Sequence, residues 1–165
     1  MPNTYKLISS VTVGSGGAAS MVFSSIPQTY TDLLIKVSAR GVGIDNQLTF
    51  NGSTSNNSSR YLFGNGASAI SGSDASNIQL QGSTESGNTA NTFGNMEIYI
   101  PNYTSANYKS VSIDAVTENN ATTAYAFLSA GLWSNTAAIT SATITNSSGN
   151  YVQYSTAYLY GISNA

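Results

Sequence analysis

The sequence predicts an all-β protein, an antiparallel β-sandwich of about ten or eleven short strands. Apolar and polar residues alternate with a period of two along most of the 165 residues, as they do in strands with one buried face. The alternating runs are rich in Val, Ile, Thr, Tyr and Phe, whereas Gly, Asn, Ser and Asp fill the gaps between them. Regular strands separated by turn residues are typical of a sandwich or a barrel.

The alternation identifies each strand in turn. It is clear in 31–40, where Leu33 and Ile35 alternate with Lys36, and in 93–100, where Met96 and Ile98 alternate with polar positions. In chain order, the predicted strands are 4–13, 19–26, 31–40, 46–50, 60–63, 77–81, 93–100, 108–118, 123–134, 138–145 and 151–162. A chain of this length fits a single domain, here 1–165.

Three places depart from the regular pattern. Ile139 and Ile144 lie on opposite parities of one run, and Gly131 interrupts another, so each position is a candidate β-bulge. The segment 51–92 is rich in Asn, Gly, Ser and Thr. We expect it to form long loops that carry one or two short strands, and long loops in a small domain are commonly functional.

Charged residues are scarce and small polar residues replace them. Only 7% of the chain is charged, and Ser, Thr, Asn and Gly make up 78 of the 165 residues. The net charge of −2 provides no basic surface, so we expect no nucleic-acid partner. No apolar run is long enough to cross a membrane, and Met1 to Lys6 do not resemble the start of a Sec signal peptide, so we expect no membrane partner.

The residue types also argue against catalysis. The chain has no His and no Cys, which excludes His-based acid–base chemistry, thiol nucleophiles, disulfides and ordinary zinc sites. A Ser–Lys pair would need an activated Lys, but Lys6, Lys36 and Lys109 are expected on outward parities of their strands. We therefore expect a protein that is not an enzyme and has no catalytic residues.

The carboxylates favour structural roles. Glu97 and Asp114 are expected to face each other from neighbouring strands on the solvent side, where they would keep the sheet soluble rather than form a glycosidase pair. Asp45 and the stretch 74–77 supply oxygen ligands of the kind that calcium prefers, but Asp and Asn are also turn formers. We expect no metal and no cofactor.

Arginine and aromatic residues supply the candidates for contact with a partner. They are Arg40, Arg60, Tyr61, Trp133, Tyr154 and Tyr158. Arg and Trp are enriched at interface anchors, although an Arg is also a common surface charge and a Trp a common core residue. Tyr154, Tyr158 and Tyr160 share a parity, so they form a stripe that faces either the core or a partner subunit.

Several short stretches resemble sequences of one known family. They are Tyr5–Ile8, Phe23–Leu33, Ser38–Arg40, Thr49–Gly52, Asn91–Gly94, Glu97–Tyr103, Glu118–Ala121, Ala130–Thr136 and Tyr158–Ile162. In their order and over nearly the whole chain, these stretches are similar to small structural proteins of tailed-phage virions. The resemblance implies a jelly-roll-like β-sandwich without enzyme activity.

Two functions follow as expectations from the resemblance. The first is a capsid decoration (cement) protein, a homo-oligomer and specifically a trimer, bound to the major capsid protein on the outer surface of the virion. The second is a tail-tip or fibre module that presents 51–66 and 82–92 to a host glycan. A free carbohydrate-binding or hydrolytic domain is a third, less favoured alternative, because His is absent and carboxylates are sparse.

Overall fold

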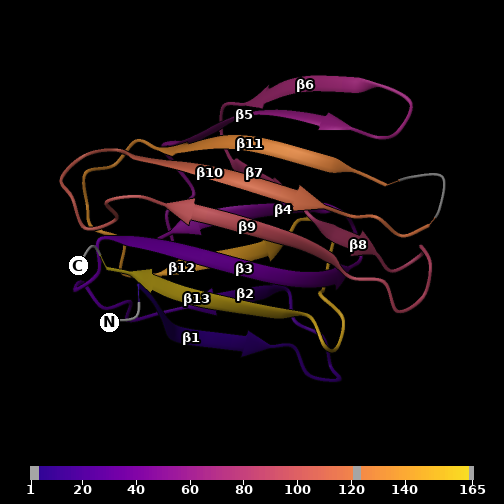
Figure 1. The fold of residues 1–165 in the computed structure, drawn as a ribbon, viewed down its shortest axis with the longest axis horizontal. Helices are drawn as coiled ribbons and strands as arrows, with labels where there is room; N and C mark the ends of the chain where they lie inside the picture. Colours follow the sequence, from indigo (N-terminus) through magenta and orange to yellow (C-terminus); the bar gives the residue numbers. More distant parts are fainter. Residues whose placement is uncertain (1–3, 121–123, 164–165) are drawn as a thin grey trace.

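The computed structural model describes residues 4–120 and 124–163, and the elements in those residues are all strands (Figure 1). Within this part of the chain, no helix is long and apolar enough to span a membrane. The thirteen strands are β1 (Tyr5–Thr12), β2 (Ser20–Phe23), β3 (Asp32–Gly41), β4 (Asp45–Phe50), β5 (Asn57–Gly64), β6 (Ala69–Asp74), β7 (Ile78–Gln81), β8 (Ser83–Glu85), β9 (Gly94–Ile100), β10 (Lys109–Val116), β11 (Ala126–Trp133), β12 (Ala142–Asn146) and β13 (Thr156–Ile162). Residue 123, the predicted start of one strand, and both ends of the predicted domain lie outside the described residues.

The strands form two sheets that pack face to face. The larger sheet has the order β1-β13-β3-β9-β10-β11-β5-β6, and β8 pairs in parallel beside β3. The smaller sheet has the order β2-β12-β4-β7. Figure 1 shows the larger sheet in front, with β6 at its upper edge and β1 at its lower edge.

The topology is that of a jelly roll. Early strands pair antiparallel with late ones in four nested pairs: β1 with β13, β2 with β12, β3 with β9, and β4 with β7. These pairs alternate between the two sheets, as a doubled hairpin does when it wraps around a core. The predicted fold class is confirmed, with slightly more strands than expected.

Four further strands, β10, β11, β5 and β6, widen the larger sheet beyond β9. The inserted β5 also protects the free edge of β7 in the smaller sheet. The Ser59 hydroxyl donates to the Asn77 carbonyl at 2.9 Å and accepts from the Gln79 amide at 3.2 Å. Side-chain bonds thus satisfy backbone groups that an edge strand would leave open.

The structure corrects the prediction for 51–92. Four strands, β5 to β8, occupy much of this segment, which we expected to be mostly loop. Two of them gave no clear pattern in the sequence: β6 lies at the sheet edge with few apolar residues, and β8 is three residues long. β6 is largely exposed, and β8 buries the polar residues Ser83 and Thr84, so neither strand carries a clear alternation of apolar and polar residues.

The two predicted bulges are also corrected. Gly131 stays in regular register with both neighbours of β11, and a Cβ there would lie 2.5 Å from Ile78 Cγ2 of the opposite sheet. Ile139 precedes β12, so the change of parity falls outside the strand. Among the described strands of the larger sheet, the register shift lies in β1, between Leu7 and Ser9.

Candidate partner interface

The outer face of the larger sheet carries side chains in continuous lateral rows. Pairing in register places equivalent positions of neighbouring strands side by side. One row runs from β13 to β5 through Tyr158, Lys36, Glu97, Asp114, Leu128 and Leu62. The row is aromatic at one end, charged in the middle and aliphatic at the other end.

The charged middle of this row contains an ion pair between Lys36 and Glu97. Lys36 Nζ lies 2.7 Å from Glu97 Oε2, and this hydrogen bond raises the pKa of Lys36. Asp114 stands beside Glu97 on the next strand, as the sequence predicted, and is exposed. Both partners of the ion pair are half exposed, so it adds little stability and serves mainly to divide the face in two.

One side of this division is rich in tyrosine. We call it the tyrosine half, defined by the outward residues Tyr5, Leu7, Leu34, Tyr99, Tyr158 and Tyr160. Leu7, Tyr160, Leu34 and Tyr99 form one lateral row across four strands. The Tyr99 hydroxyl donates to Asp32 at 2.8 Å, which fixes the ring and raises the pKa of Tyr99.

Tyr158 is 38% exposed on the outer face, so it does not face the core. This position is compatible with contact to a partner, which stays a prediction. Tyr154 does not belong to the stripe. It precedes β13, its φ is 73°, and its ring is 70% exposed. The predicted strand 151–162 began too early, since β13 starts at Thr156.

The other side of the division is aliphatic. We call it the aliphatic half, defined by Leu62, Val116, Ala126, Leu128 and Ala130. The two leucines face each other in register and are each about half exposed. Exposed apolar clusters on a rigid sheet are typical of protein contact sites.

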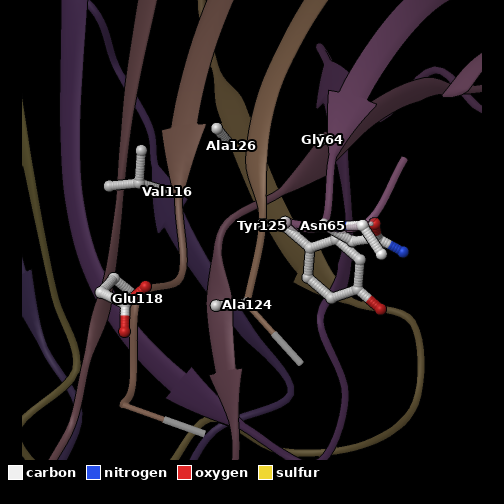
Figure 2. A pocket seen from close by; sticks show the side chains of 9 residues that line it. Gly64, Asn65, Val116, Glu118, Ala124, Tyr125 and Ala126 are labelled. Carbon is white, nitrogen blue, oxygen red and sulfur yellow. Dashed lines mark hydrogen bonds between the residues drawn. The ribbon is translucent and has the colours of Figure 1, made fainter. Parts of the chain in front are cut away.

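Hollows flank the two leucines. One, of about 400 Å³, is lined by residues that include Arg60, Leu62, Leu128 and Ala130. Another, of about 520 Å³, opens beyond Ala126, and Figure 2 shows Tyr125 and Asn65 on one side of it and Val116 and Glu118 on the other. The face is therefore not flat, and side chains of a partner have depressions to enter.

Arg60 lies at the border of the aliphatic half, as a surface residue. It is exposed, sits in register with Ala130, and donates from Nη1 to the neighbouring Ser59 carbonyl at 3.1 Å. Its guanidinium is thus accessible, and contact with a partner stays a prediction for this residue.

Arg40 has an internal role, which corrects its prediction as a partner contact. It is 8% exposed. Its guanidinium donates to the carbonyls of Ser86, Asn88, Thr89 and Thr92 at 2.8–3.1 Å. These bonds satisfy backbone groups of the loop that follows β8, so Arg40 holds this loop against the sheet.

Trp133 is a core residue, so its prediction as a partner contact is also corrected. It is 1% exposed and its ring packs 5.7 Å from that of Phe50. The aromatic row of β11 faces the core and the aliphatic row faces outward. A side chain with so little exposed area has no surface to offer to a partner in the folded chain.

Lys109 is buried, contrary to the outward position predicted for it. Its ammonium donates to the carbonyls of Ser105 and Asn107 at 2.7 and 2.6 Å. Burial lowers the pKa of this group. Lys6 and Lys36 are exposed as predicted.

A polar cleft of about 230 Å³ contains the remaining candidate, Tyr61. The ring packs 5.6 Å from that of Phe127 and covers Gly72, where a Cβ would meet it at 2.7 Å. The other lining residues are Asp45, Gln47, Gln79, Gln81 and Ser147. Amide and carboxylate groups can bond the hydroxyls of a ligand while an aromatic ring packs on its apolar face.

The Asp74 turn is organised by hydrogen-bond donors. Its carboxylate accepts from the amides of Ser76 and Asn77 and from the side chains of Asn77 and Gln79. Burial raises the pKa of Asp74, but these four bonds outweigh it and lower the pKa to about 2. N–H donors surround the oxygens, which favours the turn-forming interpretation of 74–77 over a calcium site. Among the described residues, no three His, Cys, Asp or Glu are grouped as metal ligands.

Comparison with known proteins adds no family to this description. The chain matches no protein-family model, and no curated protein matches its sequence.

The aliphatic half was not predicted from the sequence. A signal for it was present in 123–134, where an aliphatic row alternates with an aromatic one, so that both faces of the strand are apolar. A strand with two apolar faces at the surface of a domain indicates a second contact on its outer side.

Proposed function

We propose that the protein is a non-enzymatic structural component of a phage virion, namely a capsid decoration (cement) protein. In this role it binds the outer shell and bridges neighbouring major capsid proteins. The observation that carries the proposal is the tyrosine half, an exposed aromatic surface on a two-layer jelly roll. The resemblance of the sequence to small virion proteins supplies the partner.

The chemistry of the tyrosine half supports such a contact. Tyrosine buries a large rigid ring at a low cost in side-chain entropy, and its hydroxyl keeps a hydrogen bond at the rim of an interface. Rows set by strand register present these rings at fixed spacing. The action would be passive, because area buried between neighbouring capsid proteins raises the free energy needed to separate them, and repetition over the shell multiplies weak contacts.

The test is to mix the purified protein with capsids that lack it and to image them by electron cryomicroscopy. We expect symmetric density on the shell, with the tyrosine half toward the capsid proteins. Tyr158→Ser should lower occupancy by about tenfold or more, as loss of an aromatic anchor does. Tyr108→Ser is the matched control, because Tyr108 is 60% exposed and precedes β10, outside the residues that define the tyrosine half. Bare capsids would reject the proposal.

The second candidate is a tail-tip or fibre module that binds a host glycan. The polar cleft around Tyr61 favours it, whereas the expected loops do not: β5 occupies much of 51–66, and Arg40 holds the loop within 82–92. Protein found on tails or host cells, with binding lost in Gln47→Ala, would support this function over decoration.

A further inference from the structure

We propose that the aliphatic half binds a second copy of the chain across a two-fold axis. In this dimer, Arg60 of each copy lies beside Asp114 of the other, and the leucines pack between the two ion pairs. The inference concerns self-association alone, so it holds or fails independently of capsid binding.

The leucine pair provides the apolar contact surface. Leu62 and Leu128 are 53% and 50% exposed and lie in register on β5 and β11. The hollow of about 400 Å³ beside them also has Arg60 in its wall. A copy of the same face would bring both a leucine to fill the hollow and a hollow to receive a leucine.

Two opposite charges, Arg60 and Asp114, lie on either side of the leucines. Asp114 is in register with Leu128, and Arg60 with Ala130. In the described part of the chain, neither charge lies within ion-pair distance of an opposite one; the ion pair there is Lys36–Glu97. Asp114 of β10 and Arg60 of β5 are thus left unmatched within one copy.

The geometry of the sheet shows why a two-fold axis brings Arg60 of one copy beside Asp114 of the other. Arg60 and Asp114 lie two strands and two residues apart, or about 12 Å at standard strand spacings. A two-fold axis exchanges the two positions when it lies in the plane of the face, passes through the midpoint of the line between them and is perpendicular to that line. A second copy turned about this axis forms both ion pairs at once, which is the reciprocity of an isologous contact.

The same axis places the leucines correctly. It crosses the face over β11, between Leu128 and Ala130. The rotation then carries the leucine pair of one copy onto that of the other, so the apolar groups meet at the centre and the charges lie around them. Such an apolar centre with a polar rim is the usual organisation of a protein interface.

The size of the face predicts a weak dimer. Three strands and three lateral rows cover about 14 Å by 20 Å, so that two copies would bury on the order of 600 Å² in total, below the range of stable complexes. We therefore expect micromolar association. A reciprocal contact of this kind produces a dimer, in contrast to the trimer expected from the sequence.

The test is sedimentation equilibrium over a wide range of concentration, with the full chain. We expect a mass that rises from 17.1 kDa toward twice that value. Arg60→Asp and Asp114→Arg, made singly, should each weaken association by about tenfold or more through like-charge contact. The double variant should recover to within about threefold of the native protein, because each reversed charge then meets its opposite.

Two further variants complete the design. Leu128→Ser should weaken association by about tenfold with an unchanged melting temperature, since Leu128 is half exposed. Lys6→Glu is the control, because it makes the same change in charge as Arg60→Asp at an exposed position on β1. A monomer at all concentrations, a trimer, or a double variant as weak as the single ones would overturn the proposal.

Discussion

Arg40 shows how one side chain orders a loop. Its guanidinium reaches four backbone carbonyls of the segment from Ser86 to Thr92. The planar fork of an arginine bonds several acceptors at once, and a lysine ammonium cannot reproduce that geometry. The loop has few apolar residues of its own, so these bonds are its main attachment to the sheet.

Arg40→Lys should therefore destabilise the protein by about 2 kcal/mol, because buried carbonyls lose their partners. Chemical denaturation measures the loss, and hydrogen exchange should quicken in the Ser86–Thr92 segment. Arg60→Lys is the matched control and should change stability by less than about 0.5 kcal/mol, since Arg60 is exposed. Equal losses in the two variants would contradict the role assigned to Arg40.

Asp74 makes stability depend on pH. Its pKa is lowered to about 2 from an ordinary value of 3.8, so the folded state binds the proton more weakly than the unfolded state does. Its contribution is complete above about pH 4 and is lost as the pH falls toward 2. Allowing for solvent screening, we expect about 1 kcal/mol.

Acid titration of the unfolding free energy tests this expectation. Asp74→Asn keeps an oxygen acceptor for the turn but has no charge to lose, so it should lack this part of the acid dependence. A variant that loses the same free energy between pH 4 and 2 as the native protein would assign the effect to other groups.

At the scale of single residues, the alternation of apolar and polar types predicts well which side chains share a face of a strand. It predicts less well which of the two faces is buried. Leu33 and Ile35 were assigned correctly because the opposite row of their strand, apart from Leu34, is polar. In β11 both rows are apolar, so the sequence left open whether Trp133 faces the core. Arg40 was assigned to a surface because the loop that covers it folds back from 49 residues away along the chain.

At the scale of elements, Gly131 fixes how closely the two sheets approach. A Cβ at this position would lie 2.5 Å from Ile78 Cγ2 and 2.8 Å from Val111 Cγ2. Both neighbours are β-branched side chains, which have few alternative rotamers. β7 therefore packs directly on the backbone of β11.

Gly131→Ala should destabilise the protein by about 1–3 kcal/mol through overpacking. Gly64→Ala in the adjacent strand is the control, because the nearest atom to its added Cβ is 4.0 Å away. Thermal melts of both variants measure the difference. If both melt alike, the close approach of the sheets at Gly131 does not limit stability.

The strands that the sequence failed to predict have a common physical reason. β6 gains its order from the hairpin with the preceding β5, and β8 gains its order from parallel pairing with the distant β3. Local alternation reports burial, whereas edge pairing depends on backbone hydrogen bonds that any polar sequence can make. Of the central strands, β3, β9 and β10 were predicted to within two residues of their bounds, whereas the starts of β12 and β13 were placed four and five residues too early.

At the scale of the whole molecule, the two sheets share one core, which includes Phe50 from the smaller sheet and Trp133 from the larger. We therefore expect the predicted single domain to unfold in one cooperative step. Trp133 is the one tryptophan of the chain, so its fluorescence reports the core directly. Fluorescence and far-ultraviolet circular dichroism should give the same midpoint in urea, and separate midpoints would contradict a single domain.

The larger sheet also separates two kinds of surface on one molecule. The tyrosine half and the aliphatic half stand on opposite sides of the charged middle, and both belong to the same rigid sheet. Contact at one half leaves the other half free. A protein built this way can be attached to a shell and to its own copy at the same time, and the variants above affect each contact separately.

The nested strand pairing has a consequence for biosynthesis. β1 and β2 are made before the other strands, yet their partners β13 and β12 are made after all of them. At about 5–20 residues per second, β1 waits on the order of 10–30 s for its neighbour. The core therefore closes only after β12 and β13 have been made, and until then the nascent chain depends on its abundant Ser, Thr and Asn to stay soluble.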